Sequence, residues 1–195
     1  MKILKTITLL SISASLLISA PLSEKKSELK DIKQIGQNSS MLLLKTLGKN
    51  MKKNMKSGGV INALDFCSNR AYTLTEDVNK QLPHGVSAQR ISAKYRSEAN
   101  KPTDSELVVL KSFEAMKKNN IILPKQLIQK VDSHTYKYYK PLVITKQVCL
   151  KCHGTLKAGK LKDEISKRYP LDKAMGYKMG DLRGAVVVTI DKSVK

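Results

Sequence analysis

Apolar residues recur at helical spacing through the first third of the chain. Between residues 24 and 56 they form one stripe among lysines and asparagines, made of Leu29, Ile32, Ile35, Leu44, Leu47, Met51 and Met55. This periodicity predicts a long amphipathic helix. A Ser-Gly-Gly sequence at 57–59 interrupts it, and the helical pattern resumes over 60–81 before proline and glycine at 82–85 end it. We therefore expect a helical hairpin or one kinked helix.

The rest of the chain changes from helical periodicity to alternation and β-branched runs. A weak alternation over 86–95 predicts a strand. Thr103 followed three residues later by Glu106 has the form of a capping box, and a helical pattern continues from it. The aromatic and β-branched segments 133–144 and 182–190 predict two further strands.

Helices that precede separated strands, without a repeating strand-helix unit, define the expected fold class. This order predicts an α+β domain built on an antiparallel sheet. We expect one domain over residues 21–195, because that length is enough to bury a core of its own. Its helical part covers about 24–82 and its strand-rich part about 86–195.

Residues 1–20 have the pattern of a secretory signal peptide. Lys2 and Lys5 precede an uncharged, mostly apolar run over 7–18, and Ser19-Ala20 offers a cleavage point. The run is too short to span a bilayer comfortably, although an uncleaved anchor is the alternative. We expect a periplasmic or otherwise exported protein, either soluble or held by its N-terminus.

The strongest chemical signal is the pentapeptide Cys149-Leu150-Lys151-Cys152-His153. Two cysteines three positions apart, followed at once by histidine, have the spacing of c-type haem attachment. Each thiol forms a thioether with one vinyl group, and the adjoining histidine reaches the iron. We predict one covalent haem c, attached at Cys149 and Cys152 with His153 as an iron ligand.

Three other chemistries compete for the two cysteines of the motif. A thioredoxin-like redox pair requires a strand and a helix N-terminus, whereas the flanks 141–148 and 154–159 have the pattern of strand and loop. A zinc site requires two more ligands, and the chain has no second paired motif. A disulfide across two residues is strained. Haem attachment is therefore the favoured interpretation.

Cys67 is a candidate for the second iron ligand. On a helix it shares a face with Ala63 and Ala71, whose small side chains leave room for a flat macrocycle. It is also the one cysteine outside the motif in a chain with three, and a single unpaired cysteine in an exported protein indicates a specific role. A small buried apolar side chain and an intermolecular disulfide are the alternatives.

Other side chains compete for the same position on the iron. Met175 and Met179 are candidates because methionine opposite histidine is common in cytochromes c. His84 in a Pro-Gly turn and His134 in a predicted strand are further candidates. The residues alone leave the second ligand open among these five side chains.

The basic segment over 90–96 suggests partners for the haem propionates. Arg90, Lys94 and Arg96 are the candidates, because two buried carboxylates need charge-assisted donors. A solvated basic strand edge is the alternative for each of them.

The formal net charge of +20 narrows the class of partner. Nucleic acid is the usual partner of so basic a chain. Here the lysines are spread along the whole sequence, and two phenylalanines with no tryptophan offer little for base stacking. We expect an acidic redox partner protein and no nucleic acid. Peripheral contact with anionic membrane lipid and a homodimer are further candidates.

Short blocks of sequence occur in an order that matches a known family. They are Gly58-Gly59 with Ala63 and Cys67, then 90–96 with Asn100-Lys101-Pro102, then Tyr139-Lys140-Pro141-Leu142 leading into the haem motif, and last Tyr169-Pro170, Gly176-Tyr177, Gly180-Asp181 and Arg183-Gly184-Ala185. In these blocks the chain resembles the Tll-like haem-domain family over nearly all of its mature length.

The resemblance implies a monohaem c-type cytochrome in which N-terminal helices flank a PAS-like antiparallel sheet. It also implies that the iron ligands are His153 and Cys67. One departure lies at 103–106, where the family often has a tryptophan and this chain has Thr-Asp-Ser-Glu. That departure concerns local packing rather than the ligands.

A function in electron transfer or redox sensing follows from two protein ligands on one iron. Such an iron has no open position for a substrate, so we do not expect an enzyme. The alternatives are a PAS-like sensory module, which binds a small gas or signals to a partner, and a haem oxidoreductase such as a peroxide-reactive enzyme.

Overall fold

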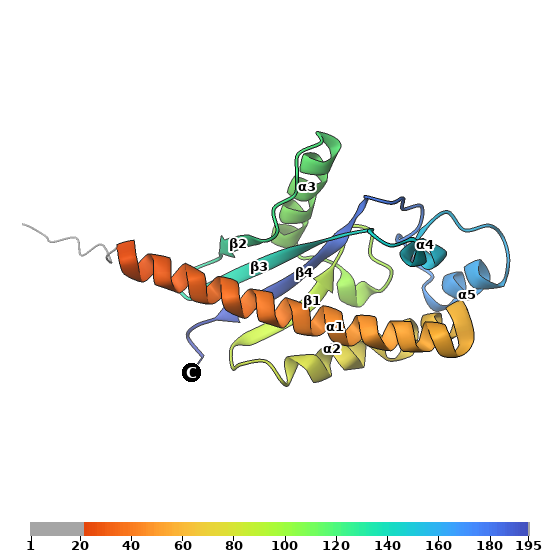
Figure 1. Cartoon of the computed structure of the whole chain (residues 1–195), viewed down its shortest axis with the longest axis horizontal. Helices are drawn as coiled ribbons and strands as arrows, with labels where there is room; N and C mark the ends of the chain where they lie inside the picture. The colour runs from red at the N-terminus through yellow and green to blue at the C-terminus, as the bar shows by residue number, and fades with distance from the viewer. Residues whose placement is uncertain (1–21, 195) are drawn as a thin grey trace, which may run out of the picture.

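The computed structural model describes residues 22–194, with side chains from residue 24 onward. The predicted signal peptide at 1–20 lies outside the described residues. The elements, in chain order, are α1 (Leu22–Asn69), α2 (Ala71–Asn79), β1 (Val86–Ile91), the 3-10 turn η1 (Glu98–Asn100), α3 (Asp104–Lys118), β2 (Leu127–Lys130), β3 (Thr135–Val143), α4 (Gln147–His153), α5 (Lys160–Arg168) and β4 (Leu182–Asp191). Figure 1 shows α1 crossing the sheet, with α4 and α5 gathered at one end.

The long first helix turns back on itself where the sequence predicts a break. Gly58 and Gly59 have non-helical backbone angles, and Gly59 has a φ of 71°, which favours glycine. Beyond them the chain returns along the first part of α1 (Figure 1). The predicted hairpin is confirmed. The helix expected over 60–81 bends at Arg70, but helical hydrogen bonds continue through it from Arg70 N to Phe66 O and from Leu74 N to Arg70 O.

The sheet is antiparallel throughout, with the strand order β1-β4-β3-β2. The central strand β4 is buried over five consecutive residues, because it has a neighbour on each side and helices on both faces. Burial on both faces explains its continuous apolar run. The predicted strands in 133–144 and 182–190 are confirmed, whereas the strand expected over 86–95 ends at Ile91.

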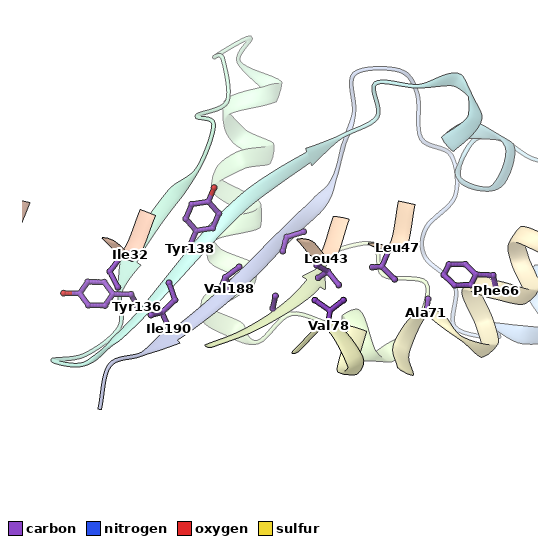
Figure 2. Packing of buried hydrophobic residues seen from close by; sticks show 12 residues of the cluster. Ile32, Leu43, Leu47, Phe66, Ala71, Val78, Tyr136, Tyr138, Val188 and Ile190 are labelled. Carbon is purple, nitrogen blue, oxygen red and sulfur yellow. The ribbon is translucent and has the colours of Figure 1, made fainter. Parts of the chain in front are cut away.

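One face of the sheet packs against α1 and α2. Figure 2 shows Ile32 of α1 near Tyr136 and Tyr138 of β3, and Leu43 of the same helix over Val78 of α2, all in one apolar cluster. The helix crosses the sheet closely at Gly36, where a Cβ atom would lie 2.2 Å from Cγ of the Tyr138 ring. Glycine is therefore required at that crossing.

The other face packs against α3. Val109, Leu110 and Phe113 meet the opposite side of the central strands in a second apolar cluster. The capping box predicted for this helix is confirmed, since the Glu106 carboxylate accepts from Thr103 N at 2.9 Å. Glu106 is also buried and forms an ion pair with Lys137 Nζ at 2.7 Å, which ties α3 to β3.

Three short elements carry no strong sequence pattern. The flanks of the motif agree with the expected strand and loop, since β3 ends at Val143 and residues 154–159 form no helix or strand. The motif itself forms α4, a helix of seven residues that is too short to show helical periodicity. The sequence pattern also missed the four-residue edge strand β2 and the helix α5, in which Ile165 is the buried residue.

The fold class predicted from the sequence is confirmed. Long N-terminal helices precede an antiparallel sheet in an α+β arrangement. Among residues 22–194, no helix combines the length and the apolar character needed to cross a membrane.

Candidate functional site

Four segments that are distant in sequence meet at the α4 end of the sheet (Figure 1). Backbone hydrogen bonds join the loop before β4 to the motif, from Gly176 N to Gly154 O at 3.1 Å and from Tyr177 N to His153 O at 2.9 Å. The same loop is bonded to the chain after β1, since Lys173 N donates to Tyr95 O at 3.0 Å. These bonds attach the C-terminal end of α4 to the loop that precedes β4.

The imidazole of His153 has a defined orientation. Its Nδ1 lies 2.9 Å from Ala174 O, and because a carbonyl only accepts, Nδ1 carries the proton. The other nitrogen, Nε2, then keeps its lone pair and points away from Ala174. This is the arrangement of a metal-ligating histidine, whose outer nitrogen donates to a carbonyl. The Tyr177 ring packs edge-on to the imidazole at 6.3 Å between ring centroids.

His153 is neutral over the physiological pH range. Burial lowers its pKa to about 3, and the positive charges of Arg183 and Arg96 contribute, against the hydrogen bond to Ala174. A neutral imidazole is the form that binds a metal ion.

Arg96 holds the backbone around the motif. Its Nη2 donates to Cys152 O at 2.7 Å and to Ala174 O at 3.2 Å, the carbonyl that also receives His153 Nδ1. Asp172 pairs with the guanidinium at 3.0 Å and accepts from Ala174 N at 2.7 Å. The side chains of both partners are buried, with 9% and 4% exposed. The Arg96–Asp172 pair therefore positions the carbonyl that orients His153.

Arg90 differs from Arg96 in having no protein partner. Within residues 24–194, its half-buried side chain makes no hydrogen bond or ion pair. Burial lowers the pKa of its guanidinium, and the negative charges of ionised Cys67 and Tyr169 oppose that effect. A half-buried guanidinium without a protein acceptor can bind an anionic group from outside the chain. The role of Arg90 and Arg96 towards propionates stays a prediction.

Cys67, near the C-terminal end of α1, lies within electrostatic range of the motif. The pKa of the Cys152 thiol is raised by burial first, and the charge of Cys67 adds to that rise. The Cys67 side chain retains solvent exposure. The protein around it nevertheless raises the pKa of its thiol by desolvation, while Arg90 and Arg96 lower it. All three cysteines are free thiols, as thioether formation and iron ligation both require.

An ion-pair cluster fixes the segment that carries Cys67. Arg168 of α5 pairs with Asp65 of α1 and with Glu164 of its own helix, the latter at 2.9 Å. It also donates to Ser68 Oγ at 3.2 Å. Residues on both sides of Cys67 are thus held against α5.

The two histidines outside the motif lie at the opposite end of the sheet. His134 directly precedes β3, whose other end leads into α4. His84 precedes Gly85, whose carbonyl accepts from Asp191 N at 2.8 Å, and Asp191 pairs with Thr135. The nine residues of β3 span about 30 Å, so neither histidine reaches the motif.

The side chains of Lys94 and Arg183 lie beside the Tyr177 ring. Lys94 Nζ donates to Met175 O at 2.7 Å and lies 4.6 Å from the centroid of the Tyr177 ring. Arg183 lies 5.3 Å from the same centroid and donates to Ser92 Oγ at 2.7 Å. Sequence reasoning missed the roles of Asp172, Tyr177 and Arg183. Tyr177 and Arg183 belong to the blocks shared with the family, and Asp172 lies between the blocks Tyr169-Pro170 and Gly176-Tyr177.

Acidic and metal-binding side chains do not form a separate cluster in this part of the structure. Across the described residues, no three histidine, cysteine, aspartate or glutamate side chains gather as a metal site. The candidate donors on and near the motif are His153 and the thiols of Cys149, Cys152 and Cys67.

These features define an α+β protein that presents a Cys-x-x-Cys-His helix at one end of an antiparallel sheet. Residues 22–191 match the model of the Tll0287-like family, and the chain belongs to that family. The crystal structure of the cyanobacterial heme-protein Tll0287 is similar, with 21% identity over 90% of this chain and 99% of that chain and a TM-score of 0.55. This likeness shows a shared fold. No curated protein matches the chain.

Proposed function

We propose that the chain is an exported monohaem c-type cytochrome for electron transfer or redox sensing. The observation that carries this proposal is the orientation of His153, whose Nδ1 bond to Ala174 O leaves Nε2 free beside two free thiols. A family that includes a heme-protein of the same fold supports it. Cys149 and Cys152 would attach the haem, and His153 and Cys67 would hold the iron.

The residues present fit a haem c. Cys149 and Cys152 lie three residues apart on one helix and would form thioethers with the two vinyl groups of a haem, and a neutral histidine follows them. Arg90 supplies a half-buried positive charge without a protein acceptor, which suits a propionate. The donor set therefore agrees with the group that the motif implies.

Cys67 is a better second ligand than Met175 on geometric grounds. Met175 directly follows Ala174, whose carbonyl contacts the Nδ1 side of the imidazole. Nε2, which would bind the iron, lies on the other side of the imidazole ring, so the Met175 backbone lies away from the expected iron position. Cys67 comes from α1, a different element, and it affects the pKa of Cys152 in the motif. Met179 is 44% exposed, in the same loop as Met175.

The bound haem would supply a one-electron redox centre, and the chain would set its environment. Arg96 and Asp172 hold the carbonyl that orients His153 and so restrict rotation of the imidazole. Cys67, if bound as a thiolate, would favour oxidised iron and lower the potential relative to a methionine ligand. Two protein ligands leave no open position, which favours a carrier or sensor over an enzyme.

The ligand assignment is tested by substitution at Cys67 and Met175. We expect Cys67→Ala to change the ferric electron paramagnetic resonance spectrum and to raise the reduction potential, because the anionic donor is lost. Met175→Ala is the matched control and should leave both unchanged. Unchanged spectra in Cys67→Ala together with altered spectra in Met175→Ala would overturn the assignment of cysteine.

An acidic partner suits the basic surface of the proposed carrier. A net charge of +20 attracts an acidic donor or acceptor over several ångströms. Electron-transfer rates with such a partner should fall as salt rises, because exposed charges are screened beyond about 10 Å at 0.1 M. A rate that is flat from low to high ionic strength would contradict electrostatic attraction.

A further inference from the structure

A shallow groove of about 610 Å³ lies between the first turns of α1 and the edge of the sheet, away from the motif. Lys26, Lys30 and Lys33 line it from α1, and Lys130 lines it from β2. Leu29 and Ile128 supply apolar surface between these lysines. Figure 1 shows β2 and the start of α1 at the opposite end of the molecule from α4 and α5.

Four lysines and none of the described acidic side chains line this groove, so its positive charge is only partly balanced, by the nearby Glu28 carboxylate. Among the described residues, none of the four lysines forms an ion pair. The carboxylate of Glu28, the acidic side chain nearest in sequence to Leu29, pairs with Lys192. Lys130 Nζ instead lies 5.5 Å from the centroid of the Tyr136 ring. The groove therefore carries a concentrated positive charge that is open to an external anion.

The placement of these lysines is unfavourable for the helix that carries them. Lys26 and Lys30 are four residues apart and Lys30 and Lys33 three apart, so like charges are neighbours on one helix face. The first turn of α1 holds Glu24, as the helix dipole favours, and the lysines follow it. Their spacing does not stabilise the helix, which is compatible with a role in binding an external anion.

The groove combines charge with exposed apolar surface. Leu29 is 43% exposed, and Val131, next to Lys130, is 50% exposed. A free phosphate would use only the lysines. A surface of anionic lipid uses both, because lysines bind headgroup phosphates while apolar side chains enter the boundary with the acyl chains.

The position of the groove in the chain agrees with a membrane. The helix begins at Leu22, directly after the segment 1–20 predicted to be a signal peptide or anchor.

We propose that this groove docks the protein on a bilayer that contains anionic phospholipid. The residues of α1 from Lys30 to Ser57 span about 40 Å at helical rise, so docking would hold the motif end away from the membrane. The docked molecule would then present the motif to partners in the surrounding solution. This inference does not depend on the haem or on its ligands.

The test compares two triple variants of the full chain that lose the same charge from the same helix. One carries Lys26→Gln, Lys30→Gln and Lys33→Gln. The control carries Lys45→Gln, Lys49→Gln and Lys52→Gln, three exposed lysines with identical spacing. Cosedimentation is measured with phosphatidylcholine vesicles and with vesicles that also contain phosphatidylglycerol. The ratio of the two affinities removes any contribution of residues 1–20 that is independent of lipid charge.

We expect the groove variant to lose on the order of 100-fold of the preference for anionic vesicles, since each lysine near such a surface contributes about fivefold. The control should lose less than about fivefold in the same measurement. Leu29→Ser should weaken binding to anionic vesicles while the charge is unchanged.

Three results would overturn the proposal. The first is an equal loss in both triple variants, which would mean diffuse charge rather than a site. The second is no preference of the unmodified chain for anionic vesicles. The third is displacement from the vesicles by inorganic phosphate at matched ionic strength, which would identify a site for small anions.

Discussion

The two ends of the molecule use positive charge in different ways. At the α4 end the charges are arginines covered by protein, and Arg96 donates to two backbone carbonyls and to a buried aspartate. At the groove end the charges are exposed lysines without carboxylate partners among the described residues. The planar guanidinium fixes several acceptors in defined directions, whereas the flexible ammonium acts as a solvated point charge. The α4 end therefore holds backbone and side-chain groups in a fixed geometry, whereas the groove end can attract an anion without fixed contacts.

A second contrast lies inside the α4 end, between Arg96 and Arg90. Arg96 has Asp172 and two carbonyls as acceptors, and it forms part of the protein's own hydrogen-bond network. Arg90 lies near the same Cys67 thiol but has no acceptor among the described residues. The first residue should stabilise the fold, and the second should act on a bound anion.

The largest expected effect follows from removal of Arg96. Arg96→Met should lower the free energy of unfolding by about 3–5 kcal/mol, because it leaves Asp172 buried and unpaired. Unfolding in urea, followed by circular dichroism, measures this loss. The double variant Arg96→Met/Asp172→Leu should recover part of it, since no unpaired charge remains. A loss below about 1 kcal/mol in the single variant would mean that the pair does not hold the fold.

Stability of the haem-free chain should fall in acid because of His153. Its folded pKa of about 3 lies below the unfolded value near 6.5, so the unfolded chain binds the extra proton between these pH values. The contribution is complete above about pH 6.5 and is lost on acidification to about pH 3, on the order of a few kcal/mol. Unfolding of Cys149→Ala/Cys152→Ala, which cannot attach haem, measures this dependence. Adding His153→Phe should flatten it, and an unchanged slope would contradict the assignment to His153.

The close crossing of α1 over the sheet gives a smaller effect with a matched control. Gly36→Ala should lower the free energy of unfolding by about 1–3 kcal/mol, because the new methyl group meets the buried Tyr138 ring. Gly48→Ala on the same helix meets no atom within 4 Å and should raise it by about 0.5–1 kcal/mol. Thermal unfolding of both variants measures these changes. Equal shifts in the midpoint temperature of the two variants would show that α1 does not cross the sheet closely at Gly36.

The smallest effect on the fold is expected from Arg90. In the haem-free chain, Arg90→Met should change the free energy of unfolding by less than about 1 kcal/mol or increase it, because the charge has no partner to lose. In the haem-loaded protein it should lower the reduction potential, because a positive charge near the iron favours the reduced state. Redox titration beside urea unfolding separates the two roles. A large loss of stability in the haem-free chain would mean that Arg90, like Arg96, stabilises the fold.

The sequence predicts the elements whose pattern is long or unbroken. The stripe in α1 repeats over many turns, and β4 is an apolar run without interruption, so both were expected. The break at Gly58 and Gly59 was predictable because glycine is unfavourable inside a helix and readily adopts backbone angles that other residues avoid. The elements β2, α4 and α5 are too short or too charged for periodicity to identify.

The part of the candidate site that consists of neighbouring residues in the sequence was predictable. Cys149, Cys152 and His153 form a motif, and the family resemblance singled out Cys67. The carbonyl of Ala174 and the carboxylate of Asp172 could not be predicted, because they act on residues up to 78 positions away. Such contacts depend on tertiary structure and leave no local pattern.

Covalent attachment of haem is tested most directly by the mass of the intact chain. The protein is exported in a host that attaches c-type haem, then denatured, extracted with acidified acetone and weighed by mass spectrometry. We expect the unmodified chain to retain the mass of one haem, Cys149→Ala/Cys152→Ala to retain none, and Cys67→Ala to retain it in full. An unmodified chain that weighs only as much as its polypeptide, or that arrives with zinc in place of haem, would contradict the proposed function.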